Sequence, residues 1–132
     1  EIVRTCIQFN PDLNVQNLMA KCESLLADQC FKQKNNSTTV GMTTCFREEE
    51  VVWNTLLNDY YRKLKGRLDK EQFEALTEVQ RDWIKLRQKK CLLIHKIFEG
   101  SITQIMASQC ALSETARRTI EFRLMLEELP AN

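Results

Sequence analysis

Six cysteines are the residues of this chain with the clearest chemistry. They are Cys6, Cys22, Cys30, Cys45, Cys91 and Cys110, separated by 15, 7, 14, 45 and 18 residues. Zinc sites usually present cysteines two to four residues apart or several histidines, and this chain has neither pattern, with a single histidine. An even number of widely spaced cysteines is typical of a disulfide framework in an oxidising compartment. We therefore expect three disulfides and no metal site.

Nucleophilic catalysis of the Ser–His–Asp or Cys–His type would depend on His95, the single histidine. Disulfide-bonded cysteines are not nucleophiles. His95 lies near the end of a predicted helix, where a cationic ring interacts favourably with the helix dipole. We expect a capping or surface role for His95, no catalytic residue, no cofactor and no enzymatic activity.

Acidic residues recur at three- and four-residue steps along one predicted helix: Glu71, Glu74, Glu78 and Asp82. One helix face lacks the cleft between two carboxylates that glycoside hydrolysis requires, so we interpret this stripe as a solvated face. The same helix closes with basic residues: Lys85, Lys89 and Lys90. Three further acids, at 48–50, are expected in the first turns of a helix, where the dipole favours negative charge.

Trp83 and Arg87 lie four residues apart, so the guanidinium can stack on the indole. The functional interpretation is a recognition patch. The structural interpretation places Trp83 in the helical core with the Arg87 stem covering it. We favour the structural one, because tryptophan usually supplies buried area first.

Composition limits the class of protein. The chain has 132 residues, enough for one domain of three or four helices, and only three Gly and two Pro, which argues against a β-sandwich or barrel. A net charge of +1 gives no field that favours nucleic acid. No apolar run approaches the ~20 residues that span a bilayer, so no transmembrane segment is expected.

Periodicity predicts helices over residues 11–31, 43–65, 70–98 and 102–129. Asn10 and Pro11 are expected as N-cap and first residue of the first helix. The polar run 32–41 is a predicted loop. Gly66 and Asp69 bracket a second turn, and Gly100 and Ser101 end one helix and cap the next.

These lengths and short connections predict an all-α bundle of about four helices in which neighbours are antiparallel. The helix at 70–98 has a run of apolar residues at helical steps, which we expect in the core: Phe73, Leu76, Val79, Trp83, Leu86, Ile94 and Phe98.

Helix geometry constrains the disulfide pairing. Cys22 and Cys30 would lie about 12 Å apart along an unbroken helix, farther than the roughly 4.4–6.8 Å between bridged Cα atoms. One end of the bundle collects Cys30, Cys45, Cys91 and Cys110, and geometry alone does not choose among their pairings. Cys6 is left for Cys22. We favour the pairs Cys6–Cys22, Cys30–Cys45 and Cys91–Cys110.

Several short motifs occur in the last three quarters of the chain. The most specific combines Gln80, Trp83, Arg87 and Cys91. The others are Asp28-Gln29-Cys30 with Met42-Thr43-Thr44-Cys45, Leu57-Asn58 with Tyr61 and Leu64, Gly100-Ser101 with Cys110, and Thr115, Arg118 and Glu121. With these motifs the segment from about Cys30 to Leu129 resembles the small exported bacterial domain at the N-terminus of the lysozyme-inhibitor lipoprotein LprI.

Two departures from that family stand out. Asn54 occupies a position where the family often has Asp. Residues 1–27, with Cys6 and Cys22, have no clear place in the short form of the domain, and two extra cysteines support pairing them with each other. We therefore divide the chain into an N-terminal helical arm, 1–29, and one compact LprI-like helical domain, 30–132.

The resemblance implies an exported bacterial protein-binding module, a lysozyme inhibitor that docks on its enzyme and blocks it sterically. Because lysozymes are commonly basic, an acidic patch would speed association. The candidate contacts are Trp83, Arg87, Glu71, Glu74, Glu78, Gly100 and Ser101. We expect a periplasmic or secreted protein whose signal peptide has been removed, and a lipid-bearing cysteine before Glu1 is compatible with that.

Two other classes compete with this hypothesis. An envelope structural or stress protein would bind peptidoglycan or another envelope protein and have no enzyme target. A helical, disulfide-bonded ligand of the cytokine type would also share the composition, but it would not carry the LprI motifs.

Overall fold

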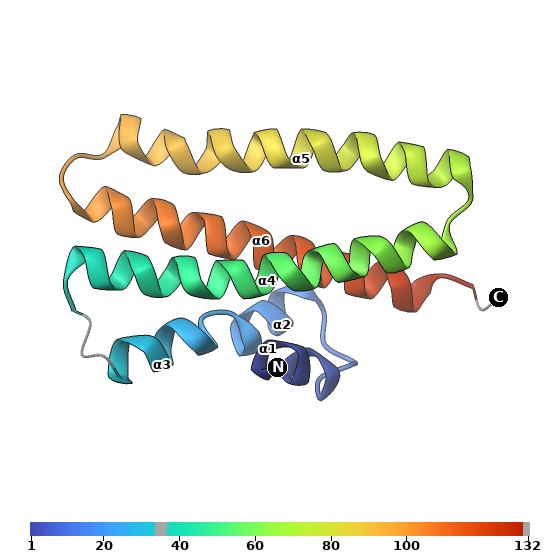
Figure 1. Ribbon diagram of the computed structural model, residues 1–132, viewed down its shortest axis with the longest axis horizontal. Coiled ribbons are helices and arrows are strands. Elements are labelled where there is room, and N and C mark those ends of the chain that lie inside the picture. Colours follow the sequence, from blue (N-terminus) through green and yellow to red (C-terminus); the bar gives the residue numbers. More distant parts are fainter. Residues whose placement is uncertain (34–36, 131–132) are drawn as a thin grey trace.

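The computed structural model describes residues 1–33 and 37–130, which are all-α, without strands, and linked by three disulfides. The helices are α1 (Ile2–Gln8), α2 (Val15–Cys22), α3 (Leu25–Gln33), α4 (Thr39–Arg67), α5 (Lys70–Ile97) and α6 (Ile102–Glu128). The last three are long and stack in layers, and the short α1–α3 lie against the side of α4 and α6 that faces away from α5 (Figure 1). The expected disulfide-linked helical bundle is confirmed.

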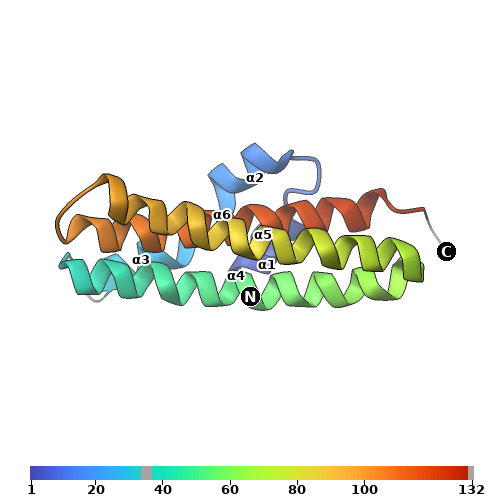
Figure 2. The same ribbon diagram turned by 90° about the horizontal axis from the view of Figure 1, so that it is seen from above.

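Consecutive long helices run antiparallel, as predicted, but the closest helix pair is not consecutive. The chain passes along α4, returns along α5, and passes in the first direction again along α6, so that α4 and α6 are parallel (Figures 1 and 2). The α4–α6 pair is the most extensive helix contact, and α5 packs mainly against α6. Hence α5 is an outer layer.

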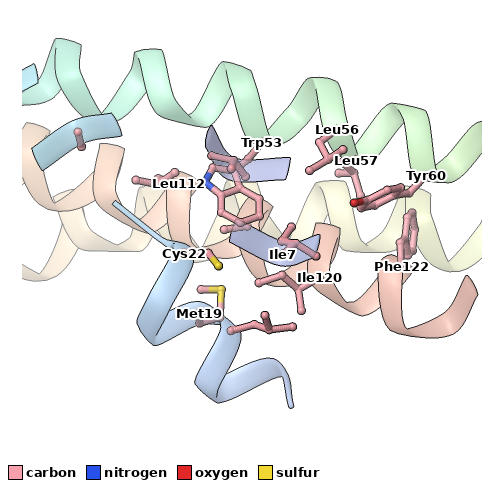
Figure 3. Close-up of a cluster of buried hydrophobic side chains, with 14 of the residues drawn as sticks. Ile7, Met19, Cys22, Trp53, Leu56, Leu57, Tyr60, Leu112, Ile120 and Phe122 are labelled. Atoms are coloured by element: carbon pink, nitrogen blue, oxygen red, sulfur yellow. The ribbon is translucent and has the colours of Figure 1, made fainter. Parts of the chain in front are cut away.

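The core lies between α4, α6 and the short N-terminal helices. Trp53 and Phe122 are its largest fully buried side chains. Around them pack residues from four helices, shown in Figure 3: Ile7, Met19, Cys22, Leu56, Leu57, Tyr60, Leu112 and Ile120. Burial of this apolar area is the main force that holds the arm to the bundle.

The prediction of which α5 residues lie in the core is wrong in part. Leu76 is buried, and Phe73, Trp83 and Ile94 are partly buried. The others are exposed, by 54% for Val79, 62% for Leu86 and 49% for Phe98. Because α5 contacts essentially one neighbour, it buries only a narrow face, and apolar residues beside that face stay in solvent.

The predicted helix at 11–31 is also wrong, because this segment begins with the turn before α2 and then contains α2 and most of α3, separated by a break at residues 23–24. Pro11 lies in the turn before α2. The Asn10 side chain donates a hydrogen bond to the Cys6 carbonyl oxygen at 2.8 Å, so it caps the end of α1 instead of starting a helix. Asn14 takes the N-cap role and accepts from the Asn17 amide at 2.9 Å. Ser24, at φ +70°, separates α2 from α3.

The later helix boundaries were predicted more closely. Asp69 caps α5 in a capping box with Gln72, and α5 and α6 each end within one residue of the predicted position. The Thr38 hydroxyl accepts from the Gly41 amide at 3.0 Å, so α4 begins before the predicted residue 43. It also continues through Gly66, which lies in the helix and not in a turn. Consequently the acids at 48–50 lie well inside α4, and not in its first turns.

The structure agrees only in part with the predictions for the loop at 32–41 and for the cap at Ser101. Of the predicted loop 32–41, both ends belong to α3 and α4, and 34–36 lie outside the described residues. Ser101 occupies the N-cap position of α6, but its side chain makes no capping hydrogen bond.

The disulfides join Cys6 with Cys22, Cys30 with Cys45 and Cys91 with Cys110, which are the pairs favoured from the sequence. They connect α1 to α2, α3 to α4 and α5 to α6 respectively. The argument against a Cys22–Cys30 pair assumed an unbroken helix, and the break at Ser24 removes that premise.

Within the described residues, no helix combines the length and apolar character that crossing a membrane demands.

Candidate protein-interaction surface

The contact residues predicted from the sequence lie in three separate places along α5 and beyond it. Glu71, Glu74 and Glu78 are exposed on its first half. Trp83 and Arg87 lie near its middle, and 100–101 form the connection at its far end. With 1.5 Å per residue, α5 spans about 40 Å. One enzyme cleft therefore cannot contact both the acidic stripe and the far connection.

Trp83 and Arg87 belong to the contact between α5 and α6. Trp83 is partly buried against the core. Its ring lies 4.7 Å from the Arg87 guanidinium carbon and 5.9 Å from that of Arg118. Arg87 Nη1 donates to the Thr115 hydroxyl at 3.0 Å and lies 3.8 Å from a Glu50 carboxylate oxygen. This arrangement fits the structural interpretation of the pair, because both side chains make contacts with other residues of the fold.

A groove of about 670 Å³ runs between α4 and α5 above α6. Its floor is made of small α6 side chains, and its walls include Arg47, Glu50, Val51, Arg87, Leu92 and His95. His95 Nδ1 lies 3.1 Å from the Thr103 hydroxyl, a partner that is not a carboxylate. In the described part of the chain, no three His, Cys, Asp or Glu side chains are grouped to hold a metal ion. The groove is thus lined by charged and apolar walls from α4 and α5 over α6.

The α5–α6 connection, residues 98–102, exposes two large apolar side chains, and we name it the tip. Phe98 is 49% exposed and Ile102 is 52% exposed. Val40 at the start of α4 is 74% exposed, and the neighbouring Thr39 hydroxyl lies 3.5 Å from that of Ser101. The tip and the start of α4 thus form one end of the molecule.

The tip is held in a defined conformation from behind. Gly100 has φ +89°, a backbone conformation that favours glycine. The Thr103 hydroxyl donates to the Gly100 carbonyl oxygen at 2.8 Å, and the Gln104 amide donates to the Ser101 carbonyl oxygen at 3.1 Å. Behind them, Cys91–Cys110 ties the two helices together. Such a loop loses little conformational freedom on binding.

A family model described as lysozyme inhibitor LprI matches residues 30–122. This chain belongs to the LprI family. The match covers most of the chain, including α4, α5 and the tip, and confirms the resemblance that the motifs indicated. No curated protein and no solved structure matches the chain. Membership of the LprI family and three disulfides are typical of an extracytoplasmic protein.

The N-terminal arm lies outside the residues that match the LprI family, and yet it completes the core. Its fully or largely buried side chains are Val3, Ile7, Leu18, Met19 and Cys22. Arg4 at the arm's surface forms an ion pair with Asp59 of α4 at 2.9 Å. In this LprI-family chain the arm therefore covers the face of α4 and α6 opposite α5.

Sequence reasoning missed the residue that anchors the arm, Glu49 of α4. Its side chain is fully buried. Its carboxylate accepts from the amides of Ser24, Leu26 and Ala27 at 2.7, 2.8 and 2.9 Å, and from the Trp53 indole at 2.9 Å. These amides lie at the start of α3, where the helix dipole also favours a negative charge. Only the position of an acid on an otherwise apolar helix face could have signalled it.

We predict that the stability of the chain depends on pH through a second acid close to this site, Glu23, which belongs to the arm. Burial raises the pKa of its carboxyl group above the ordinary 4.5, the nearby Glu49 charge raises it further, and the hydrogen bond from Ser113 opposes this. The folded chain then binds this proton more tightly than the unfolded chain does. Stability should therefore fall as pH rises from 4.5 through the raised pKa.

Glu23→Gln, which can still accept from Ser113, should raise the melting temperature at neutral pH and flatten this part of the pH profile. Thermal unfolding followed by circular dichroism between acidic and neutral pH measures both. A variant that melts below the parent at neutral pH would contradict the assignment.

Proposed function

We propose that this chain is an exported inhibitor of lysozyme, in the periplasm or secreted, and that it acts by inserting its tip into the enzyme's cleft. The observation that carries the proposal is the match to the lysozyme-inhibitor family over a segment that contains the tip. Inhibition is steric, so the chain needs no catalytic group of its own. Within this proposal the partner is a protein, and no nucleic acid is involved.

The shape and chemistry of the tip support its role. A cleft is concave, and a side chain that enters it must project from its own molecule. Phe98 and Ile102 project from the end of a long bundle with about half of each side chain exposed. Aromatic and aliphatic side chains at the centre of an interface commonly carry most of its binding energy.

The rigidity of the tip supports the same role. Cys91–Cys110 and the hydrogen bonds of Thr103 fix the loop before an enzyme arrives. A fixed loop reduces the entropic cost of binding.

The acidic stripe of Glu71, Glu74 and Glu78 is the second candidate contact. It lies too far along α5 to enter the same cleft as the tip. Its expected effect is on the rate of association with a basic enzyme, which long-range charge attraction increases.

We expect the double variant Phe98→Asp/Ile102→Asp to weaken inhibition by about 30-fold or more, because two apolar anchors are replaced by solvated charges. Turbidimetric lysis assays with several lysozymes measure the inhibition constant. Phe9→Asp is the matched control, since Phe9 is 77% exposed and belongs to the arm.

The triple variant Glu71→Gln/Glu74→Gln/Glu78→Gln should slow association and reduce its salt dependence, with a small effect on dissociation. Stopped-flow binding separates the two rates. If a stoichiometric excess of the parent chain inhibits none of the enzymes and forms no complex on gel filtration, the proposal is wrong.

A further inference from the structure

One side of α5 carries an apolar stripe that no other described part of the chain covers. Val79, Leu86 and Leu93 lie seven residues apart and are 54%, 62% and 48% exposed, and Ile97 continues the stripe at 61%. Single exposed apolar residues are normal on a protein surface, but a row of four along one helix indicates an interaction site. A seven-residue step keeps these side chains on nearly the same face of the helix.

Charges follow the solvent side of this stripe in a fixed order. Glu78 and Asp82 come first, and Lys85, Lys89 and Lys96 follow, so that acids flank the first part of the stripe and lysines flank its middle and its end. All five side chains are exposed, and none forms an ion pair or hydrogen bond with a described residue. The face is therefore complementary to a copy of itself turned end to end.

We propose that α5 is the interface of an antiparallel homodimer of this chain. With Leu86 opposite Leu86 of the second copy, Val79 meets Leu93 of the other chain. In the same register Glu78 lies within two residues of the level of Lys96 of the second copy, and Asp82 within one residue of the level of its Lys89, distances that these side chains can span. The two-fold axis repeats each pair, so four opposite-charge pairs lie along the apolar stripe.

The order of the charges selects this arrangement over the alternatives. A parallel pair of α5 helices would place acids against acids and lysines against lysines, which is destabilising. An anionic membrane surface would attract the lysine half of the stripe but repel Glu78 and Asp82. An antiparallel copy satisfies both halves at once.

The dimer is compatible with inhibition and does not depend on it. In an antiparallel pair the two tips point in opposite directions, and each stays free for one enzyme molecule. The acidic stripe would then be partly covered by the second copy, which leaves the tip as the contact that enters the cleft.

Sedimentation velocity of the disulfide-intact chain over a range of concentrations tests the proposal. We expect a reversible dimer of twice the 15.5 kDa chain mass, weakened by added salt. Glu78→Lys and Lys96→Glu should each raise the dissociation constant about tenfold, because each reversal turns two attractive pairs into repulsive ones. The combination Glu78→Lys/Lys96→Glu should restore dimerisation, since the exchanged charges again oppose each other.

Matched controls separate the interface from general surface effects. Leu86→Ser should weaken the dimer, whereas Phe9→Ser should not, because Phe9 is 77% exposed but belongs to the arm, on the opposite side of the bundle from α5. Lys21→Glu, an exposed charge on α2, should likewise leave the dimer unchanged.

A chain that stays monomeric at all concentrations, or a dimer that the two single reversals do not weaken, would overturn the proposal. The same holds for a monomer that co-sediments with phosphatidylglycerol vesicles and loses this binding on Leu86→Ser, which would assign the stripe to a membrane surface.

Discussion

Glu49→Ala is expected to lower the free energy of unfolding by about 3–5 kcal/mol, because it leaves several N–H donors without their acceptor. The substitution leaves the amides of Ser24, Leu26 and Ala27 without their acceptor in a buried site, and the Trp53 indole with them. An unsatisfied buried donor costs about 1–3 kcal/mol, so several together form the largest single-residue effect that we expect in this chain.

Denaturant unfolding of the disulfide-intact protein measures this loss. Hydrogen exchange should show that the start of α3 loses protection first, because those amides depend on Glu49. Glu49→Gln should fall between the parent and Glu49→Ala, since the amide oxygen still accepts while its NH₂ group faces other donors.

Glu74→Ala is the control for an ordinary helical acid. Glu74 is exposed on α5, and substitutions of this kind usually change stability by less than about 0.5 kcal/mol. If Glu49→Ala were as mild as Glu74→Ala, the carboxylate would not hold the arm in the way that its four hydrogen bonds indicate.

Cys91→Ala/Cys110→Ala is expected to lower stability by about 3 kcal/mol, as the loss of a disulfide that closes a loop of this length does. Loss of this disulfide should also have a local effect on α5 and the tip. The second half of α5 contacts essentially α6, so without the cross-link that half and the tip should exchange amide hydrogens faster. Within the proposed function, inhibition should then weaken about tenfold, because binding must first order the tip.

Cys6→Ala/Cys22→Ala is a close match for this variant. Its disulfide spans 16 residues of sequence, against 19 for Cys91–Cys110, so a similar loss of stability is expected. It ties α1 to α2, on the opposite side of the bundle from α5, and should leave the tip and inhibition unchanged. Equal loss of inhibition in the two double variants would show that general destabilisation, and not the order of the tip, is responsible.

Much of the candidate site follows from local signals. Asp69 with Gln72 marks the start of α5, and Gly100 marks the turn from α5 into α6, because capping and left-handed backbone preferences depend on neighbours in sequence. The spacing of Gln80, Trp83, Arg87 and Cys91 identified the family. The place of Trp83 in the fold was less certain from sequence, since the same spacing fits a surface patch and a helix contact.

The six cysteines show which part of the disulfide pattern cannot be inferred from local sequence alone. Their number and spacing indicate disulfides and an oxidising compartment, and the favoured pairs are those in the structure. The exclusion of Cys22–Cys30, however, used an unbroken helix. That helix is broken at Ser24, where Glu49 from a distant turn of α4 takes the amides that would have continued it.

By itself, then, the sequence determined the all-α class, three long helices, the ends of α5 and α6, the cysteine framework and the family. Tertiary structure alone decided that α4 pairs with α6, that the arm fills the core beside them, and that α5 keeps an apolar stripe in solvent. The physical reason is that helical periodicity shows which face of a helix is apolar, but not which neighbour covers it. That choice depends on the packing of the whole chain. The Glu49 carboxylate is an example, because the sequence places it on α4 and only the fold places it at the start of α3.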